Sequence, residues 1–168
     1  DPLGAGGTGA YSTLTNLPSL TWLHGVTSYN GYIFITGGIN SSGTALSTAY
    51  SAKINADGTL GAWQTLTNLP AVTYFPSTIA YNGYLFLAGG QTGSEYSTVY
   101  SAPIKSDGTI GSWQTLTNMP QVKTGLGGVV VNDYLFVMGG YSGGYVSTVY
   151  SAKITGDGKI GSWATLTT

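Results

Sequence analysis

A repeat of 50 residues constrains the fold of this chain more than any other feature. The same interval separates the members of three residue series: Trp63, Trp113 and Trp163; Tyr50, Tyr100 and Tyr150; Asp57, Asp107 and Asp157. Pairs of adjacent glycines keep this register, with two extra residues in the first of the loops that follow them. Such repeats are typical of proteins in which each unit buries its apolar surface against the next. The chain is therefore expected to contain three copies of one structural unit.

Each unit has the pattern of four short β-strands. In the middle unit these strands are expected at residues 77–83, 84–90, 97–104 and 111–118. The first strand ends in Asn82-Gly83 and the third is followed by Asp107-Gly108, pairs typical of tight turns because their residues tolerate positive φ. The second strand, "YLFLAGG", is apolar on both faces, so a neighbour is expected on each side. No segment shows a sustained helical period, and the predicted fold is all-β.

The first 18 residues contain a fourth copy of one segment only. "GAYSTLTNLP" at residues 9–18 repeats "GAWQTLTNLP" at 61–70, with tyrosine in place of the tryptophan. Residues 1–18 are therefore predicted to form the orphan outer strand of a fourth repeat. The complete units are expected at residues 19–70, 71–120 and 121–168. The exposed edge of an unpaired outer strand favours association, and the candidate assembly residues are Tyr11, Leu14 and Leu17.

Three motifs in each unit carry a resemblance to a known family. In the middle unit they are "YLFLAGG", "STVYSAPI" and "DGTIGSW". This combination resembles the kelch repeat, in particular the variant of exported bacterial proteins, and it covers residues 19–168 three times over. The resemblance implies a β-propeller built of four-stranded antiparallel blades.

Three blades leave a propeller ring incomplete, because propellers have typically four to eight. We therefore expect a partial propeller that is completed by oligomerisation, as a homodimer with a six-bladed ring or as a higher assembly. The alternative is that the chain is a fragment of a longer propeller.

The composition argues against several classes of partner. Charged residues make up 7% of the chain, arginine is absent and the formal net charge is −1, so a basic surface for nucleic acid is not expected. No apolar run reaches the roughly 20 residues of a membrane helix, and membrane insertion is not expected. A surface dominated by serine and threonine, together with the resemblance, favours a secreted or cell-surface location.

The residues offer little for catalysis. The kelch-like copper oxidase needs a cysteine and several histidines, whereas this chain has no cysteine and a single histidine, His24, which is expected to be structural. Asp107 and Trp113 are six positions apart, where the Asp-box of sialidases has five. The repeated aspartates are each alone in a turn, unlike the clustered carboxylates of calcium loops or glycosidases. We expect no catalytic residue, no metal and no cofactor.

Positions that differ between the repeats are the candidates for recognition. The loops after the glycine pairs and the segments between units share one face of a propeller. Its variable residues are Trp22, His24, Tyr74, Phe75, Glu95, Tyr96, Lys123, Tyr141 and Tyr145. Exposed aromatic residues among small polar ones are typical of recognition surfaces, although Trp22, Tyr74 and Phe75 alternatively fill the central channel.

These observations predict a non-enzymatic recognition or structural, self-assembling protein. It would act through the loops of one face and through association between subunits, with a protein or glycan as ligand. A carbohydrate-binding, lectin-like propeller is the alternative, and an enzyme of unknown type is the third class.

Overall fold

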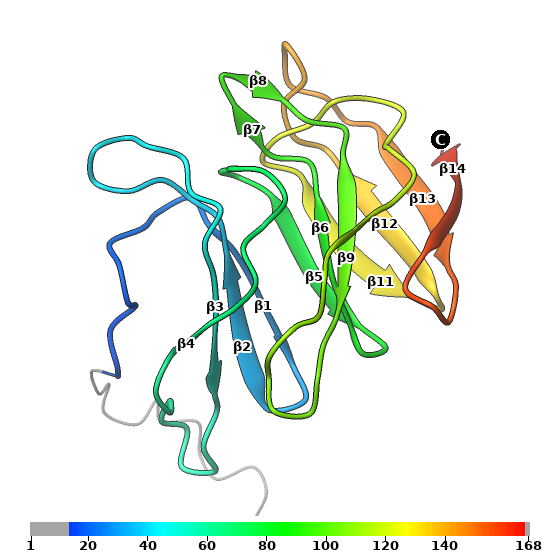
Figure 1. Ribbon diagram of the computed structural model, residues 1–168. Helices are drawn as coiled ribbons and strands as arrows, with labels where there is room; N and C mark the ends of the chain where they lie inside the picture. Colours follow the sequence, from blue (N-terminus) through cyan, green and yellow to red (C-terminus); the bar gives the residue numbers. More distant parts are fainter. Residues whose placement is uncertain (1–13, 167–168) are drawn as a thin grey trace, which may run out of the picture.

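The computed structural model describes residues 14–166, which form three four-stranded antiparallel sheets and no helix (Figure 1). Sheet 1 has the order β1 (Gly25–Tyr29), β2 (Tyr32–Thr36), β3 (Ala49–Lys53), β4 (Gln64–Thr65). Sheet 2 has the order β5 (Ser77–Tyr81), β6 (Tyr84–Ala88), β9 (Val99–Pro103), β10 (Gln114–Thr115). Sheet 3 has the order β11 (Gly127–Val131), β12 (Tyr134–Met138), β13 (Val149–Ile154), β14 (Ile160–Leu166). The predicted all-β fold with blade-like, four-stranded units is confirmed.

The turns form where their sequence predicts them. Asn30 and Asn82 have φ angles of 47° and 45°, and the glycine after each also has a positive φ. In the third unit Asp133 takes the place of this glycine, with a φ of 63°. These turns fix the register of the first hairpin in each sheet, for example Tyr81 opposite Tyr84. A two-stranded hairpin, β7 (Gln91–Thr92) with β8 (Ser94–Glu95), lies in the loop after the second glycine pair.

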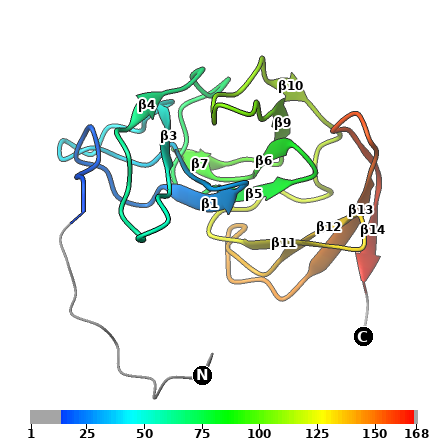
Figure 2. The same cartoon turned by 90° about the horizontal axis from the view of Figure 1, so that it is seen from below.

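The sheets pack face to face, and their first strands lie side by side. Figure 2 shows the three sheets fanned out, with β5 between β1 and β11. Each sheet has a front face, which carries the phenylalanine of its second strand, and a rear face, which carries the aliphatic residues on either side of it. The front face of sheet 1 packs on the rear face of sheet 2 through Phe34, Ala49, Leu66, Leu85, Leu87 and Ile110. The front face of sheet 2 packs on sheet 3 through Phe86, Val99, Leu116, Leu135, Val137 and Ile160. Most of the core therefore lies between sheets.

The same polar contacts join the sheets at both interfaces. The amide of Gly38 donates to the carbonyl of Thr73 at 2.8 Å, and that of Gly90 donates to Lys123 at 2.9 Å. The hydroxyl of Ser51 donates to the carbonyl of Gly108 at 2.8 Å. In the next interface, Ser101 donates to Gly158 at 2.7 Å. These donors and acceptors are buried, and leaving one unpaired is costly, so the contacts fix how neighbouring sheets are placed.

The repeated tryptophans are half-buried and bridge neighbouring units. Trp113 packs at the edge of the first interface, and its indole N–H donates to the carbonyl of Thr67 at 3.3 Å. Trp163 makes the equivalent contact with Thr117 at 3.0 Å. Their large rings cover the core from outside while the indole nitrogen stays near the surface.

The N-terminal segment makes this tryptophan contact with the first unit. Trp63 donates to the carbonyl of Thr15 at 3.3 Å, and Thr15 is the counterpart of Thr67 in the orphan copy. Residues 14–18 thus contact sheet 1 in the same way as the last residues of units 1 and 2 contact the following sheet. Of the candidate assembly residues, Leu14 is exposed and Leu17 is half-buried, whereas Tyr11 lies outside the described residues. The C-terminal copy forms β14 and pairs with β13.

We expect Trp113→Ala to lower the free energy of unfolding by about 3 kcal/mol, because it leaves a cavity at the edge of the core and removes the hydrogen bond to Thr67. Trp22→Ala should cost less than about 1 kcal/mol, because this side chain is 57% exposed. Urea unfolding followed by circular dichroism measures both. Equal losses would show that the repeated tryptophan does not join the units.

Candidate functional site

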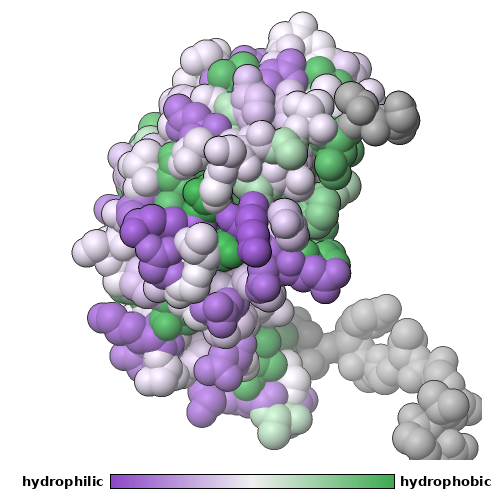
Figure 3. Space-filling model, turned by 90° about the vertical axis from the view of Figure 1, so that its right-hand side faces the viewer, coloured by the Kyte–Doolittle hydropathy of each residue, from purple (hydrophilic) through white to green (hydrophobic). Residues whose placement is uncertain are grey.

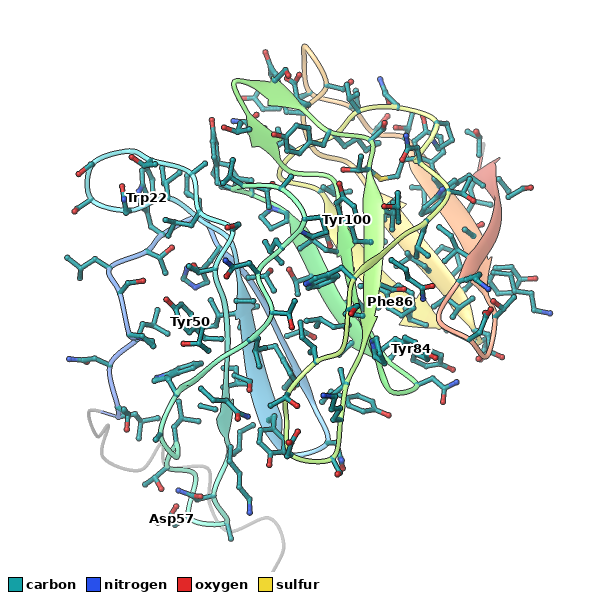
Figure 4. The ribbon with its side chains drawn as sticks, in the orientation of Figure 1. Trp22, Tyr50, Asp57, Tyr84, Phe86 and Tyr100 are labelled. Carbon is teal, nitrogen blue, oxygen red and sulfur yellow. The ribbon has the colours of Figure 1, made fainter. Side chains whose placement is uncertain are left out.

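The turns and the variable loops lie at opposite ends of the molecule. Figure 4 places Trp22 at one end and Asp57 at the other. We call the end with the loops after the glycine pairs the loop face, and the end with the Asp-Gly turns the turn face. At the turn face, the carboxylates of Asp57 and Asp107 accept hydrogen bonds from the amide and hydroxyl of the threonine two residues on. These bonds lower the pKa of both aspartates. The predicted turn role of these residues is confirmed.

The third aspartate has the strongest partners. Asp157 accepts hydrogen bonds from the ammonium of Lys159 and the hydroxyl of Thr155, and these lower its pKa to about 2. All three aspartates are exposed and lie in the turns of three different units. Within residues 14–166 no group of three acidic or histidine side chains is placed to hold a metal ion. In the same residues no helix is long and apolar enough to cross a membrane.

The segments between units lie next to each other at the loop face. The amide of Phe75 donates to the carbonyl of Leu23 at 2.7 Å, and the amide of Gly125 donates to Phe75 at 3.1 Å. All three residues have positive φ angles, of 57° at Leu23, 54° at Phe75 and 61° at Gly125. The backbone therefore repeats from unit to unit, while the side chains differ. Where the second unit has Tyr74-Phe75, the third has Thr124-Gly125.

The small side chains of the third segment leave a pocket between sheets 2 and 3. Its volume is about 590 Å³, and it is lined by Phe75, Gln91, Thr124, Gly125, Gly140, Tyr141, Tyr145 and Val146. The rings of Tyr141 and Tyr145 meet edge to face with centroids 5.8 Å apart. The hydroxyl of Thr124, a residue only 5% exposed, has no hydrogen-bond partner. An apolar, aromatic hollow with a few polar groups is the usual form of a small-molecule site.

The structure brings three of the predicted recognition residues together, namely Phe75, Tyr141 and Tyr145. Tyr74 packs against Phe75, with ring centroids 6.0 Å apart, but does not line the pocket. Trp22 is exposed in the segment before β1, outside the pocket lining.

Two further candidates lie in the loop of sheet 2, and neither lines the pocket. The carboxylate of Glu95 accepts a hydrogen bond from the amide of Gly143 at 3.5 Å and so joins two loops. Tyr96 is half-buried, and burial raises its pKa.

Lys123 was predicted to be a recognition residue on the loop face, and this prediction is wrong because the residue is buried. Its ammonium donates to the carbonyl of Gly139 at 2.9 Å and to the hydroxyl of Thr148 at 2.7 Å. It also lies 5.1 Å from the ring centroid of Tyr150. Burial lowers the pKa of Lys123. The hydrogen bonds and the aromatic ring compensate the buried charge, so Lys123 holds the third unit together and cannot contact a ligand.

Sequence reasoning missed Thr124, Gly125 and Val146 as pocket residues. A signal was present, since Thr124-Gly125 is the place where the third repeat loses the aromatic pair of the second. The loss of the aromatic pair leaves a hollow because the backbone at Gly125 has the same conformation as at Phe75. The sequence alone does not show this conformation.

Comparison with known proteins indicates the fold alone. No family model matches the chain, and no curated protein sequence matches it. Among solved structures, the one described as "Structure of YjhT" superposes with a TM-score of 0.75 at 16% sequence identity. The match covers 91% of this chain and 48% of that chain, so this chain spans about half the length of its structural neighbour. The all-β arrangement of three sheets is therefore shared with part of a larger structure.

The solitary histidine provides a pH test of the loop face. His24 is half-buried, and burial lowers its pKa from the usual 6.5, with no partner at its Nδ1 atom. Its folded pKa lies below its unfolded pKa, so the unfolded state binds more protons as the pH falls through 6.5. We expect the free energy of unfolding to decrease on acidification below about pH 6.5, and His24→Gln to remove this decrease. Imidazole NMR shifts against pH give the folded pKa directly; a value above 6.5 would contradict the burial argument.

Proposed function

We propose that this chain is a kelch-type propeller protein of the cell exterior that acts by recognition and self-assembly rather than by catalysis. Two copies, each with three blade-like sheets, would form a six-bladed ring. One observation carries the proposal: the front face of sheet 3 repeats the packing face of sheets 1 and 2, yet it has no neighbour among the described residues.

Equivalent residues show how far this face is uncovered. Thr36 and Ala88 are 0% exposed, whereas Met138 at the same position of sheet 3 is 38% exposed. Leu116 is 8% exposed, whereas its counterpart Leu166 is 46% exposed. In Figure 3 apolar surface runs along the right-hand edge of the molecule. A contiguous apolar face of this kind is typical of an interaction surface.

Polar groups on the same face also lack the contacts made by their counterparts. The amides of Gly38 and Gly90 each bond to the next unit, but among the described residues Gly140 has no such acceptor. Gly108 lies against the ring of Tyr32, leaving no room for a Cβ atom. The counterpart of Gly108 in unit 1, Gly58, has open space. In a ring of two copies, Gly140 would donate to Thr21 of the second copy, and Tyr134 would cover its Gly58.

The rear face of sheet 1 is the complementary surface. Leu85 of sheet 2 is 0% exposed and Ile154 of sheet 3 is 6% exposed. Their counterparts in sheet 1 are more open, since Ile33 is half-buried and Ile54 is 39% exposed. Because the front face already packs on such a rear face twice within the chain, a second copy is the partner it fits. The likeness to a chain about twice as long supports a ring made of two copies of this chain.

The N-terminal segment has a specific place in this ring. In one chain, Thr15 occupies the position beside Trp63 that the outer strand of a preceding unit would take. In the ring, β14 of the second copy arrives at this position. The two outer strands therefore compete for Trp63, and the displaced one presents a free edge for further association.

The loop face favours recognition over catalysis. Its pocket is lined by aromatic, small and neutral polar side chains, without a carboxylate or histidine in the lining. General acid and base chemistry needs such groups within hydrogen-bond reach of the substrate. A non-enzymatic binding role is the one these residues support.

The dimer is tested with matched lysine substitutions. Met138 and Val122 are 38% and 39% exposed, but only Met138 lies on the uncovered front face. We expect the unmodified chain of 17.3 kDa to sediment as a dimer of about twice that mass. Met138→Lys should weaken dimerisation at least a hundredfold, because it places a charge in an apolar contact. Val122→Lys should leave dimerisation unchanged.

A second variant approaches the interface from the other side. Gly58→Asn keeps the positive φ of 82°, which asparagine tolerates, but fills the space that Tyr134 of the second copy would occupy. It should also give monomers. Dimers that persist in both variants, or a folded monomer without any substitution, would overturn the proposed ring.

A further inference from the structure

We infer that the pocket between sheets 2 and 3 binds a neutral carbohydrate ring. This inference rests on the proposed recognition function and names its ligand class. The pocket lies within one chain, since Phe75 and the Gln91 of hairpin β7–β8 belong to unit 2, while residues 124–146 belong to unit 3. One chain therefore forms the whole pocket, without a second copy.

The pocket arises at a break in the repeat. In the second unit Tyr74 and Phe75 place two rings at the loop face, and Thr124 and Gly125 supply none in the third. The backbone is the same, because both Phe75 and Gly125 have φ angles near 60°. Nothing lies within 4 Å of the place where a Cβ atom on Gly125 would be. The hollow is thus a property of side-chain identity rather than of a different fold.

The lining matches the two kinds of surface on a sugar ring. Tyr141, Tyr145 and Phe75 are 40%, 96% and 41% exposed, so their rings offer flat apolar walls to the C–H faces of a pyranose. The carboxamide of Gln91, a half-buried lining residue, offers a donor and an acceptor to the hydroxyl groups of a sugar.

The charges around the pocket select against anionic and cationic ligands. No lining residue carries a charge. The nearby ammonium of Lys123 is buried and already donates to Gly139 and Thr148. The carboxylate of Glu95 is held by the amide of Gly143. A carboxylated or sulfated sugar would lose water without gaining a counter-ion in the pocket, so a neutral sugar fits best.

The test uses the intact chain and a panel of defined glycans. Arrays of neutral hexose and N-acetylhexosamine oligosaccharides, with sialylated and sulfated oligosaccharides for comparison, identify a binder, and titration calorimetry measures its affinity. We expect binding of neutral members only. Gln91→Leu should weaken binding about tenfold, the effect of one hydrogen bond, without loss of thermal stability.

Two further variants separate the pocket from general effects on folding. Gly125→Phe restores the residue of the second unit at a φ that Phe75 already adopts, and it should abolish binding. Thr73→Val is the control, because Thr73 is buried in the same part of unit 2 and does not line the pocket. It should leave binding unchanged.

The outcomes are distinguishable from those of the dimer test. Binding by the monomeric Met138→Lys variant, with loss in Gly125→Phe, supports the pocket whatever the state of the ring. The inference is overturned if the folded protein binds no neutral glycan, if Gln91→Leu and Gly125→Phe bind as well as the unmodified chain, or if acidic glycans bind preferentially. None of these results would disturb the proposed assembly.

Discussion

The packing of one sheet's front face on the next sheet's rear face is the interaction on which this structure depends. A four-stranded sheet that is apolar on both faces cannot bury its own surface, so each unit is stable only against a neighbour. Phe34 and Phe86 are both fully buried in this way, each beneath the following sheet. In sheet 3 the equivalent Phe136 is only half-buried, because it lies on the face that no described residue covers. The proposed self-association would follow from this repeated packing requirement.

The same requirement separates scaffold from site. Positions between sheets, such as Ser51 and Ser101, repeat because each must donate to the following turn. At the loop face the backbone bonds between neighbouring segments also repeat, but the side chains are free to change. The change from Tyr74-Phe75 to Thr124-Gly125 uses this freedom and opens a pocket without altering the scaffold. The candidate pocket thereby lies at one end of the molecule.

Much of the fold follows from the sequence, and much of the site does not. Local sequence patterns determine the strands, the tight turns and the placement of turns and loops at opposite ends of the molecule. These patterns occur in all three units, which makes the prediction easier. The burial of Lys123 depends on the carbonyl of Gly139 and the hydroxyl of Thr148, which lie 16 and 25 residues away in sequence. The half-burial of Trp113 depends on the carbonyl of Thr67 in the preceding unit. The pocket depends on the replacement of two aromatic residues by Thr124 and Gly125. Whether other segments fill the space that this leaves can be seen only in the folded structure.

Amide hydrogen exchange at three equivalent glycines tests the central claim most directly. Gly38 and Gly90 donate to the next unit within the chain, and their amides should exchange slowly at any protein concentration. If a second copy completes the ring, Gly140 should be protected to a similar degree at high concentration and lose this protection on dilution to monomer. A Gly140 amide that exchanges as fast as an exposed turn at all concentrations, while Gly38 and Gly90 stay protected, would contradict the account.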